Sequence, residues 1–302
     1  MQNILITGAA GYIGSNLVKK LLSMKYHISA VLRTTTNTAP IQSELEQISV
    51  YYDDESIEHL SEFMKKKEID CVIHLATEYI TFHNAENVGR MLKSNIDFGV
   101  RILESMRIAG VKKILYSRTS WQHYQNLSYN PVNFYAATKQ AFEDIMKYYT
   151  QAEGFSSLTL EIFDTYGEND WRSKIINLFK RNSCSQDELC LSPGEQKLDF
   201  LYIHDVTAAF YRAILQLAEL EQGTELERAI PSGDLYTLRE VVAIFEKAYE
   251  TSLNIRWGAL PYRPREIFRP VQDLHVLDNW TPSYKLYEGF RNMYELEKGG
   301  CK

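Results

Sequence analysis

Cysteine is scarce in this sequence, with four among 302 residues. Cys184 and Cys190 have five residues between them and no histidine nearby, a spacing that does not favour metal binding. We therefore expect no metal site. Scattered thiols of this kind are typical of reduced cytosolic proteins.

Long hydrophobic runs are also lacking. No stretch reaches the roughly 18 apolar residues that a membrane-spanning helix needs. A strand pattern begins already at Asn3, which leaves no room for a signal peptide. We expect a cytoplasmic protein with no membrane partner.

Positive charge is not in excess either. Lys and Arg together number 33, against 39 Asp and Glu, and the formal net charge is −6. This balance argues against a nucleic-acid-binding surface. With 45% hydrophobic and 24% charged residues, the composition is typical of a soluble globular protein. The length of 302 residues suits one large domain, or a main domain carrying a smaller one.

The sequence does contain a regular alternation of two patterns. Short β-branched or apolar runs predict strands over residues 3–7, 27–32, 48–52, 71–76, 112–117 and 158–163. Between them lie segments such as 12–24, in which apolar residues recur on one helical face. This alternation predicts an α/β fold, a Rossmann-type doubly wound parallel sheet.

The alternation weakens after residue 163, and a second loosely ordered block follows Gly223. We predict a dinucleotide-binding domain formed by residues 1–163 plus about 199–222. The remaining residues, 164–198 plus 223–302, would form a smaller, discontinuous substrate-binding lobe. In such folds ligands bind outside the carboxyl ends of the strands, so the lobe is expected over that edge.

Three glycines, Gly8, Gly11 and Gly14, lie between the first predicted strand and the first predicted helix. In this context they permit a tight turn and close approach of the backbone to a pyrophosphate, which faces the helix N-terminus. Arg33, followed by three threonines, stands at the end of the second strand, where an NAD-specific protein has an acidic residue. A guanidinium suits a 2′-phosphate, so we expect NADP (NADPH) as the cofactor.

A tyrosine is followed four residues later by a lysine twice, at Tyr135–Lys139 and at Tyr294–Lys298. Only the first pair follows a strand that ends in hydroxyl residues, which are Ser117, Thr119 and Ser120. An ammonium ion favours the phenolate, so we expect Lys139 to lower the pKa of Tyr135 and make it an effective proton donor. The second pair is expected to be an ordinary surface contact.

In this order, the features resemble the extended short-chain dehydrogenase/reductase family, which includes the NAD-dependent epimerases and dehydratases. The resemblance covers nearly the whole chain through the segments "DCVIHLAT", "LKSNIDFGVRILES", "DTYGEND", "PGEQKLDFLYIHDV", "SGDLYTLREVV" and "YRPREI". The last two match its nucleotide-sugar branch. "FYAATKQAFEDIMKYY" is similar to the corresponding segment of nucleotide-sugar 4-reductases of the CDP-abequose and CDP-paratose synthase type.

The resemblance implies a set of site residues. Those implied in catalysis are Thr119, Tyr135 and Lys139. Those implied in cofactor binding are Gly8, Gly11, Tyr12, Ile13, Gly14, Arg33, Asp53, Leu75, Ala76, Asn95, Tyr135 and Lys139. Those implied in substrate binding are Thr77, His123, Asp164, Arg263 and Arg265. The resemblance also implies a homodimer formed through helices over residues 86–108 and 134–151.

The sequence departs from the family pattern at two positions that bind substrate. Asp164 stands in place of an asparagine, and Leu198 in place of the arginine that clamps the nucleotide diphosphate. The phosphates are then expected to contact either Arg263 or Arg265. Adenine is similarly expected to contact one of two neighbouring carboxylates, Asp53 or Asp54.

Three reactions are known for nucleotide sugars on this fold. A dehydratase has an acid–base pair after the threonine, but here Ser120 and Trp121 follow Thr119. A 4-epimerase that retains NAD normally carries the acidic residue that Arg33 replaces. We therefore expect NADPH-dependent reduction of the 4-keto group of a nucleotide-linked 6-deoxy or 3,6-dideoxyhexose, with CDP as the expected nucleotide. The alternatives are a 4-epimerase with retained NAD(P), a non-catalytic NADP-binding sensor, and a reductase of small aldehydes or flavonoids.

Overall fold

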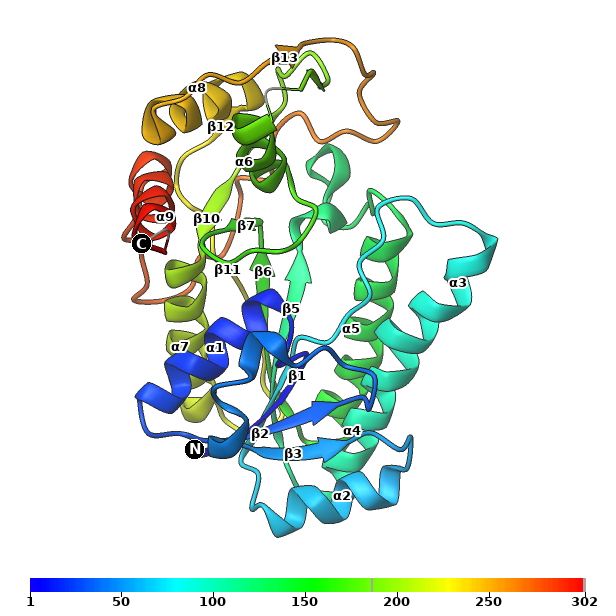
Figure 1. Cartoon of the computed structure of the whole chain (residues 1–302). Helices are drawn as coiled ribbons and strands as arrows, with labels where there is room; N and C mark the ends of the chain where they lie inside the picture. Colours follow the sequence, from blue (N-terminus) through cyan, green and yellow to red (C-terminus); the bar gives the residue numbers. More distant parts are fainter. Residues whose placement is uncertain (186, 301–302) are drawn as a thin grey trace.

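The computed structural model describes residues 1–185 and 187–300, and its centre is a seven-stranded sheet with helices on both faces (Figure 1). The strand order is β11 (Glu225–Ala229), β6 (Ser156–Ile162), β5 (Lys113–Thr119), β4 (Cys71–His74), β1 (Asn3–Thr7), β2 (His27–Leu32) and β3 (Ser49–Tyr52). Every neighbouring pair in this order is parallel. The predicted fold class is confirmed.

Two helical layers cover the sheet. One is formed by α1 (Tyr12–Ser23) and α7 (Ile203–Glu219), and the other by α2 (Ile57–Lys66), α4 (Phe98–Ala109) and α5 (Phe134–Glu153) (Figure 1). Along β1, Ile4 and Ile6 join one apolar cluster, and Leu5 joins the other. Because both faces of the sheet are buried, its strands are continuous apolar runs, which is why the pattern predicted them.

Beyond the carboxyl ends of the strands lies the smaller lobe, at the top of Figure 1. Its helices are α6 (Ile175–Ser185), α8 (Leu238–Tyr249) and α9 (Leu286–Gly300). Two short sheets lie wholly within it: β9 (Lys197–Leu198) with β12 (Tyr236–Thr237), and β8 (Leu189–Cys190) with β13 (Ile255–Arg256). A third pair, β7 (Asp164–Tyr166) with β10 (Phe200–Tyr202), lies between the lobe and the main sheet.

The predicted boundary at residue 223 is wrong for one strand. β11 begins at Glu225 and pairs in parallel with β6, so it belongs to the central sheet and not to the lobe. It is an edge strand with charged residues at positions 225, 227 and 228, so it lacks the apolar run of the buried strands. Strand bounds also differ from the prediction: β4 ends at His74, β5 continues to Thr119, and β6 begins at Ser156 and ends at Ile162.

The chain segments that connect sheet and lobe are hydrogen-bonded to one another. The Asp164 amide donates to the Asp199 carbonyl oxygen (3.0 Å), and the Ser232 amide donates to Asp199 Oδ1 (2.9 Å). The Ile230 amide donates to the Glu161 carbonyl oxygen (3.1 Å). We call these contacts the seam. It ties together three stretches that are far apart in the sequence.

Between α3 (Ala85–Leu92) and α4 the helix contains a π-helical turn, Lys93–Asp97. With this turn, residues 85–109 form one continuous helical segment beside α5 (Figure 1). None of the helices in the described ranges is long and apolar enough to cross a membrane.

His74 gives the fold a pH dependence. The ring is 1% exposed, its Nδ1 lies 2.8 Å from Thr7 Oγ1, and burial, helped by the charge of Lys139, lowers the pKa of His74 to about 3. The unfolded chain takes up a proton near pH 6.5 that the native state does not bind. The free energy of unfolding should therefore fall by about 1.4 kcal/mol per pH unit as the pH drops below about 6.5 towards 3.

Urea unfolding of the wild type and of His74→Gln, measured at about pH 7 and about pH 5, tests this expectation. The variant lacks the titrating ring, so its free energy of unfolding should lose less over the same interval. Equal losses in the two proteins would contradict the assignment to His74.

Candidate active site

Three adjoining cavities lie along the carboxyl edge of the sheet. The cofactor-end cavity has a volume of about 560 Å³, and Gly8, Arg33 and Asp53 line it. The central cavity, about 630 Å³, contains the glycine loop and Tyr135, and the lobe cavity, about 370 Å³, lies beside Asp164. Neighbouring cavities share lining residues, so together they form one groove that can hold two ligands side by side.

The loop that carries the glycines packs tightly against the loop that follows β4, the strand beside β1 in the sheet. Gly8 has a φ of +70°, and a Cβ there would lie 2.7 Å from the Ala76 amide nitrogen. A Cβ on Gly14 would lie 2.1 Å from the Gly8 carbonyl oxygen. Gly11 is the N-cap of α1 and has no side chain to cap the first turn. The first-turn amides are thus available to an anion, and the loop fits the pyrophosphate of a dinucleotide.

The cofactor-end cavity has a cationic and hydroxylic end, formed by Arg33, Thr34 and Thr36. The side chain of Thr36 holds this turn, because its Oγ1 accepts from the Arg33 amide (3.0 Å). The side chain of Arg33 is exposed, so a ligand that enters the cavity from solvent can reach it.

Of the two candidate carboxylates, Asp53 lines this cavity and Asp54 does not. Both oxygens of Asp53 accept from Arg101, at 2.8 and 3.1 Å. Asp54 instead accepts from Tyr51 (2.5 Å) and lies 2.6 Å from His59 Nδ1 on the surface. Asp53 is therefore a fixed carboxylate beside the predicted adenine site.

Leu75, Ala76 and Thr77 line the groove, as expected. Asn95 lies behind these residues and does not line the groove. Asn95 Oδ1 accepts from the Glu78 amide (2.6 Å) and from Thr77 Oγ1 (3.1 Å). Its Nδ2 donates to Thr138 Oγ1 (2.9 Å). Asn95 lies in the π-helical turn and joins the loop after β4 to the helix that carries Lys139, so we regard it as a positioning residue.

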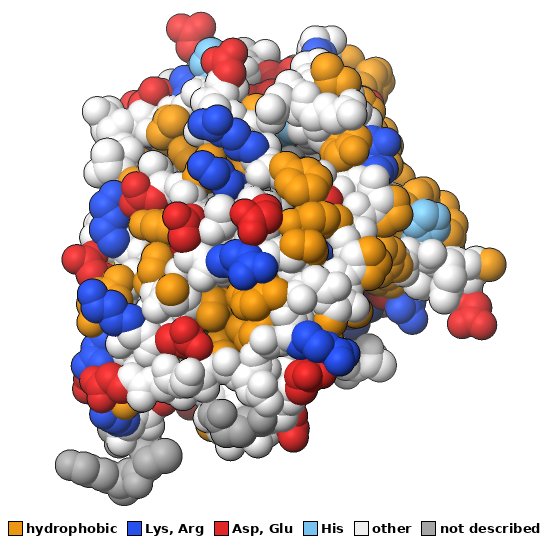
Figure 2. Space-filling view, turned by 90° about the horizontal axis from the view of Figure 1, so that it is seen from above, with side chains coloured by type: hydrophobic (Ala, Val, Ile, Leu, Met, Phe, Trp, Pro, Cys, Tyr) orange, Lys and Arg blue, Asp and Glu red, His pale blue; other side chains and the backbone are white. Residues whose placement is uncertain are grey.

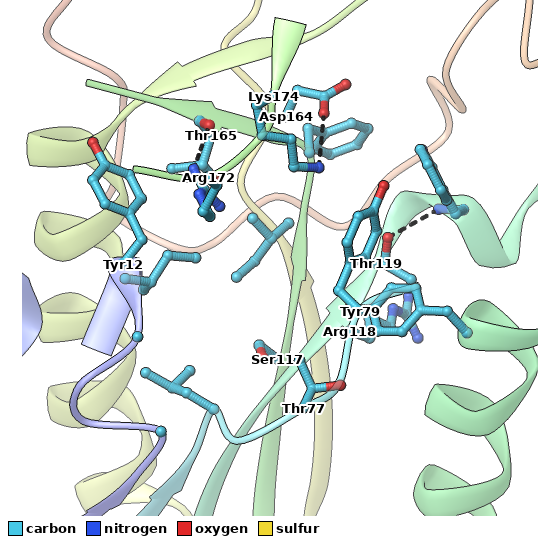
Figure 3. A pocket seen from close by; sticks show the side chains of 18 of the residues that line it. Tyr12, Thr77, Tyr79, Ser117, Arg118, Thr119, Asp164, Thr165, Arg172 and Lys174 are labelled. Atoms are coloured by element: carbon cyan, nitrogen blue, oxygen red, sulfur yellow. Dashed lines mark hydrogen bonds and ion pairs between the residues drawn. The ribbon is translucent and has the colours of Figure 1, made fainter. Parts of the chain in front are cut away.

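Tyr135 and Thr119 both line the central cavity. Thr119 is the last residue of β5, and Ser117, two positions earlier, lines the same cavity because alternate residues of a strand share a face (Figure 3). Thr119 Oγ1 accepts from the Trp121 amide (3.3 Å), which fixes the threonine rotamer. The ring of Tyr79 meets that of Tyr135 edge-on, with 5.0 Å between centroids.

Lys139 is one helical turn beyond Tyr135 and only 2% exposed, and its Nζ lies 4.1 Å from the ring centroid of Tyr116. Burial lowers the pKa of Lys139 to about 7 and raises the pKa of Tyr135 well above its usual range. The expectation that Lys139 lowers the pKa of Tyr135 is thus wrong for the ligand-free protein. Removal of the phenol from water is the main cause of the raised pKa, and the hydrogen bond with Thr77 lowers it only in part.

The second Tyr-x-x-x-Lys pair lies in α9, away from the groove. Lys298 is exposed, and its Nζ lies 4.1 Å from the ring centroid of Tyr294. This is the surface contact that the sequence predicts.

The structure separates the two candidate phosphate-binding arginines. Both line the lobe cavity, but Arg265 donates through Nη2 to Asn130 Oδ1 and stacks on Tyr124, with 4.2 Å from Cζ to the ring centroid. Arg263 lies over Trp121, at 5.5 Å. Arg265 is therefore committed to holding the loop after β5, and Arg263 is the better placed to meet a phosphate.

His123 is not brought into the groove. Its Nε2 lies 3.1 Å from Glu161 Oε2 and its Nδ1 lies 3.0 Å from the Leu127 carbonyl oxygen, and it lines none of the three cavities. Both ring nitrogens are thus used within the protein. The predicted contact of His123 with substrate is not supported.

Lys174 and Arg172 line the central cavity and were missed from the sequence. Lys174 Nζ lies 3.9 Å from Asp164 Oδ1 and 4.4 Å from the ring centroid of Tyr79, while Arg172 lies over Tyr12 (Figure 3). The signal was the cationic segment "WRSK" directly after "DTYGEND", which looks like an ordinary polar loop. Only the folded chain brings it opposite Thr119 and Tyr79.

The face seen from above carries hydrophobic side chains interspersed with both basic and acidic ones (Figure 2). The lobe cavity itself has four cationic residues in its lining: Lys174, Lys197, Arg263 and Arg265. The same lining also contains three carboxylates, Asp164, Asp199 and Glu266, so cationic residues outnumber acidic ones there by four to three, in a chain whose formal net charge is −6.

Comparison with known proteins agrees with this geometry. Residues 4–227 match the NAD dependent epimerase/dehydratase family. The chain is 26% identical to a CDP-abequose synthase of Salmonella muenchen over 98% of both chains. It is 25% identical to a dTDP-4-dehydro-6-deoxyglucose reductase of Escherichia coli over 81% of both. The crystal structure of UDP-glucose 4-epimerase from Thermotoga maritima has the same fold, with a TM-score of 0.85 and 22% identity over 99% of this chain and 100% of that one. The chain therefore belongs to the NAD dependent epimerase/dehydratase family and is an NAD(P)-dependent oxidoreductase.

Proposed function

We propose that this protein uses NADPH to reduce the 4-keto group of a nucleotide-linked 6-deoxy or 3,6-dideoxyhexose, with CDP as the nucleotide. The observation that carries the proposal is the cationic and hydroxylic end of the cofactor-end cavity, formed by Arg33, Thr34 and Thr36. NADPH, which these reductases consume, carries a 2′-phosphate. NAD, which the epimerases retain, does not. The relatives named CDP-abequose synthase and dTDP-4-dehydro-6-deoxyglucose reductase support the same substrate class.

NADPH, when bound, supplies a hydride. The protein binds the cofactor through two sets of groups. The amides of the glycine loop hold the pyrophosphate, and Arg33 holds the 2′-phosphate. Lys139 lies one turn from Tyr135 on the same helix face, and its protonated form favours the phenolate that the proton transfer leaves behind.

The proton for the new hydroxyl group comes from Tyr135. Burial raises the pKa of this phenol well above its usual range, so it is protonated at neutral pH and holds the proton that the reduction needs. The Thr119 hydroxyl donates to the same substrate oxygen and orients the carbonyl. A group that is held protonated in the resting protein suits a reduction, which consumes one proton per turnover.

The nucleotide diphosphate would occupy the lobe cavity. Lys174, Lys197 and Arg263 line it and can pair with the phosphates, which offsets the loss of the usual arginine at Leu198. The sugar would then reach from the lobe cavity into the central cavity, because the two share Tyr79, Trp121 and Asp164.

A deuterium label tests the reaction. NADPH that carries deuterium at C4 of the nicotinamide, on the transferred side, should deliver it stoichiometrically to C4 of a CDP-linked 4-keto-6-deoxy sugar. Nuclear magnetic resonance of the product measures the transfer. Product without deuterium, formed with no net consumption of NADPH, would instead indicate epimerisation or dehydration and would remove the reductase proposal.

A further inference from the structure

A buried carboxylate lies one helical turn beyond Lys139. Tyr135, Lys139 and Glu143 follow one another at intervals of four residues along α5, so their side chains share one face of the helix. Lys139 and Glu143 are both buried. Charged side chains are almost never fully buried unless they are paired, so the partners of Glu143 indicate what it does.

Two neighbours hold the carboxylate of Glu143 in place. Gln122 Nε2 donates to Glu143 Oε1 (3.1 Å), and Arg118 Nη1 lies 3.6 Å from Glu143 Oε2. Gln122 is itself fixed at the active site, because its Oε1 accepts from the Thr119 amide (3.2 Å). The carboxylate is thus anchored to the end of β5, from which Thr119 reaches the central cavity.

Arg118 cannot balance the charge of Glu143 alone, because it is shared among three carboxylates. Its Nε donates to Glu161 Oε2 (3.0 Å) and its Nη1 to Glu227 Oε2 (2.6 Å), and both contacts are shorter than the one with Glu143. His123 lies 3.1 Å from Glu161 Oε2 and so faces that carboxylate. Two phenols, which are uncharged at neutral pH, also lie near Glu143: Tyr116 on β5 and Tyr129 in the loop after it. Glu143 therefore keeps a negative charge that Arg118 balances only in part.

Lys139 in turn has Glu143 as its source of negative charge. Burial lowers the pKa of Lys139 to about 7, and Glu143 is the one charged group among the described residues that acts against this decrease. The other titratable groups around Lys139 are uncharged at neutral pH: His74 on β4, whose pKa burial lowers to about 3, and the phenols of Tyr116 and Tyr135. The amine and the carboxylate therefore complement each other in a site from which water is excluded.

We infer that Glu143 is a positioning residue that acts through Lys139: its carboxylate supplies the negative charge that keeps the Lys139 amine protonated beside Tyr135. This inference rests on the proposed function, and it names the residue that maintains the charge favouring the Tyr135 phenolate. With a neutral lysine, nothing on this helix face would stabilise the phenolate that forms when the proton leaves. Turnover should therefore depend on the carboxylate of Glu143.

The pH dependence of Glu143→Gln tests the inference, because the variant loses the charge and keeps the size of the side chain. At about pH 8.5, with saturating NADPH, kcat/KM for CDP-4-keto-6-deoxyglucose should be about tenfold below that of the wild type, since an opposite charge at this range changes the protonated fraction by about that factor. The two proteins should converge near pH 6. Burial raises the pKa of Glu143 to about 7, so the wild-type carboxylate is itself largely protonated there.

Two further variants serve as controls. Glu143→Asp retains the carboxylate and should retain most of the wild-type kcat/KM at pH 8.5. Asp144→Asn makes the same change in net charge at an exposed position of α5, and its pH profile should match that of the wild type. A purely structural role would lower kcat/KM of Glu143→Gln by the same factor at every pH, and that result would overturn the inference.

The charge of Lys139 can also be measured in the ligand-free protein. With ¹³C at the lysine Cε, the resonance that is lost in Lys139→Met identifies Lys139, and its titration should move to lower pH in Glu143→Gln. The coupling is reciprocal, so Lys139→Met should raise the pKa of Glu143. This second measurement uses ¹³C at the glutamate Cδ, with the resonance assigned by its loss in Glu143→Asp, and it does not require Glu143→Gln to fold.

These titrations separate the inference from the proposed function. If the Lys139 titration moves to lower pH in Glu143→Gln but no 4-keto sugar is reduced, the reductase proposal falls and the role of Glu143 stands. If the sugar is reduced but Lys139 titrates at the same pH with and without the carboxylate, the reductase proposal stands and the role of Glu143 falls.

Discussion

Replacing Tyr135 by phenylalanine should lower kcat for ketone reduction by about two to four orders of magnitude. The variant loses only the proton-donating hydroxyl, and its ring still packs against Tyr79. The Kd for NADPH should therefore change little. Steady-state kinetics with a saturating 4-keto sugar, together with a fluorescence titration of NADPH, measure the two quantities.

Tyr294→Phe provides the matched control, since it removes the hydroxyl of the other tyrosine that precedes a lysine by four residues. Its kcat should equal that of the wild type, because Tyr294 lies in α9, outside the groove. A large loss in Tyr294→Phe with near-normal turnover in Tyr135→Phe would reverse the assignment of the catalytic tyrosine.

Arg33→Asp should weaken NADPH binding by on the order of 1–3 kcal/mol, which corresponds to roughly 5- to 150-fold in Kd. The substitution removes a charge-assisted contact and puts a carboxylate beside the 2′-phosphate. NADH, which has no such phosphate, should lose far less, and the ratio of the two dissociation constants is the quantity to measure.

Arg181→Asp is a suitable control, because Arg181 is an exposed arginine in α6 that lines none of the cavities. It makes the same change in net charge and should leave both dissociation constants near their wild-type values. Equal weakening of NADPH and NADH by Arg33→Asp would reject Arg33 as the residue that binds the 2′-phosphate.

The buried strands and the glycine loop could be predicted from the sequence because their constraints are local. A strand buried on both faces is an apolar run, and Gly8 and Gly14 are required by the backbone contacts that a Cβ would clash with. β11 escaped prediction because an edge strand need not be apolar on both faces. Its pairing with β6 depends on residues that lie almost 70 positions earlier in the chain.

The side chains around the substrate groove were harder to predict, because contacts over long sequence separations decide them. The Arg265 side chain donates to Asn130, which lies 135 positions away in the sequence, and neither local sequence predicts this contact. His123 was expected in the groove, but Glu161, on the neighbouring strand β6, holds its ring. The raised pKa of Tyr135 likewise results from burial by the assembled fold, which the Tyr-x-x-x-Lys spacing does not encode.

The seam restricts how the groove can open. We call each chain segment that passes between sheet and lobe a crossing. Each crossing is hydrogen-bonded to another, through the Asp199 backbone and carboxylate and through the Glu161 carbonyl oxygen. Rotation of the lobe at one crossing would have to bend the others at the same time, so the seam resists such a rotation. Exchange of substrate for product between turnovers then depends on the loops that border the groove, at residues 77–84 and 258–273, which contain no regular helix or strand.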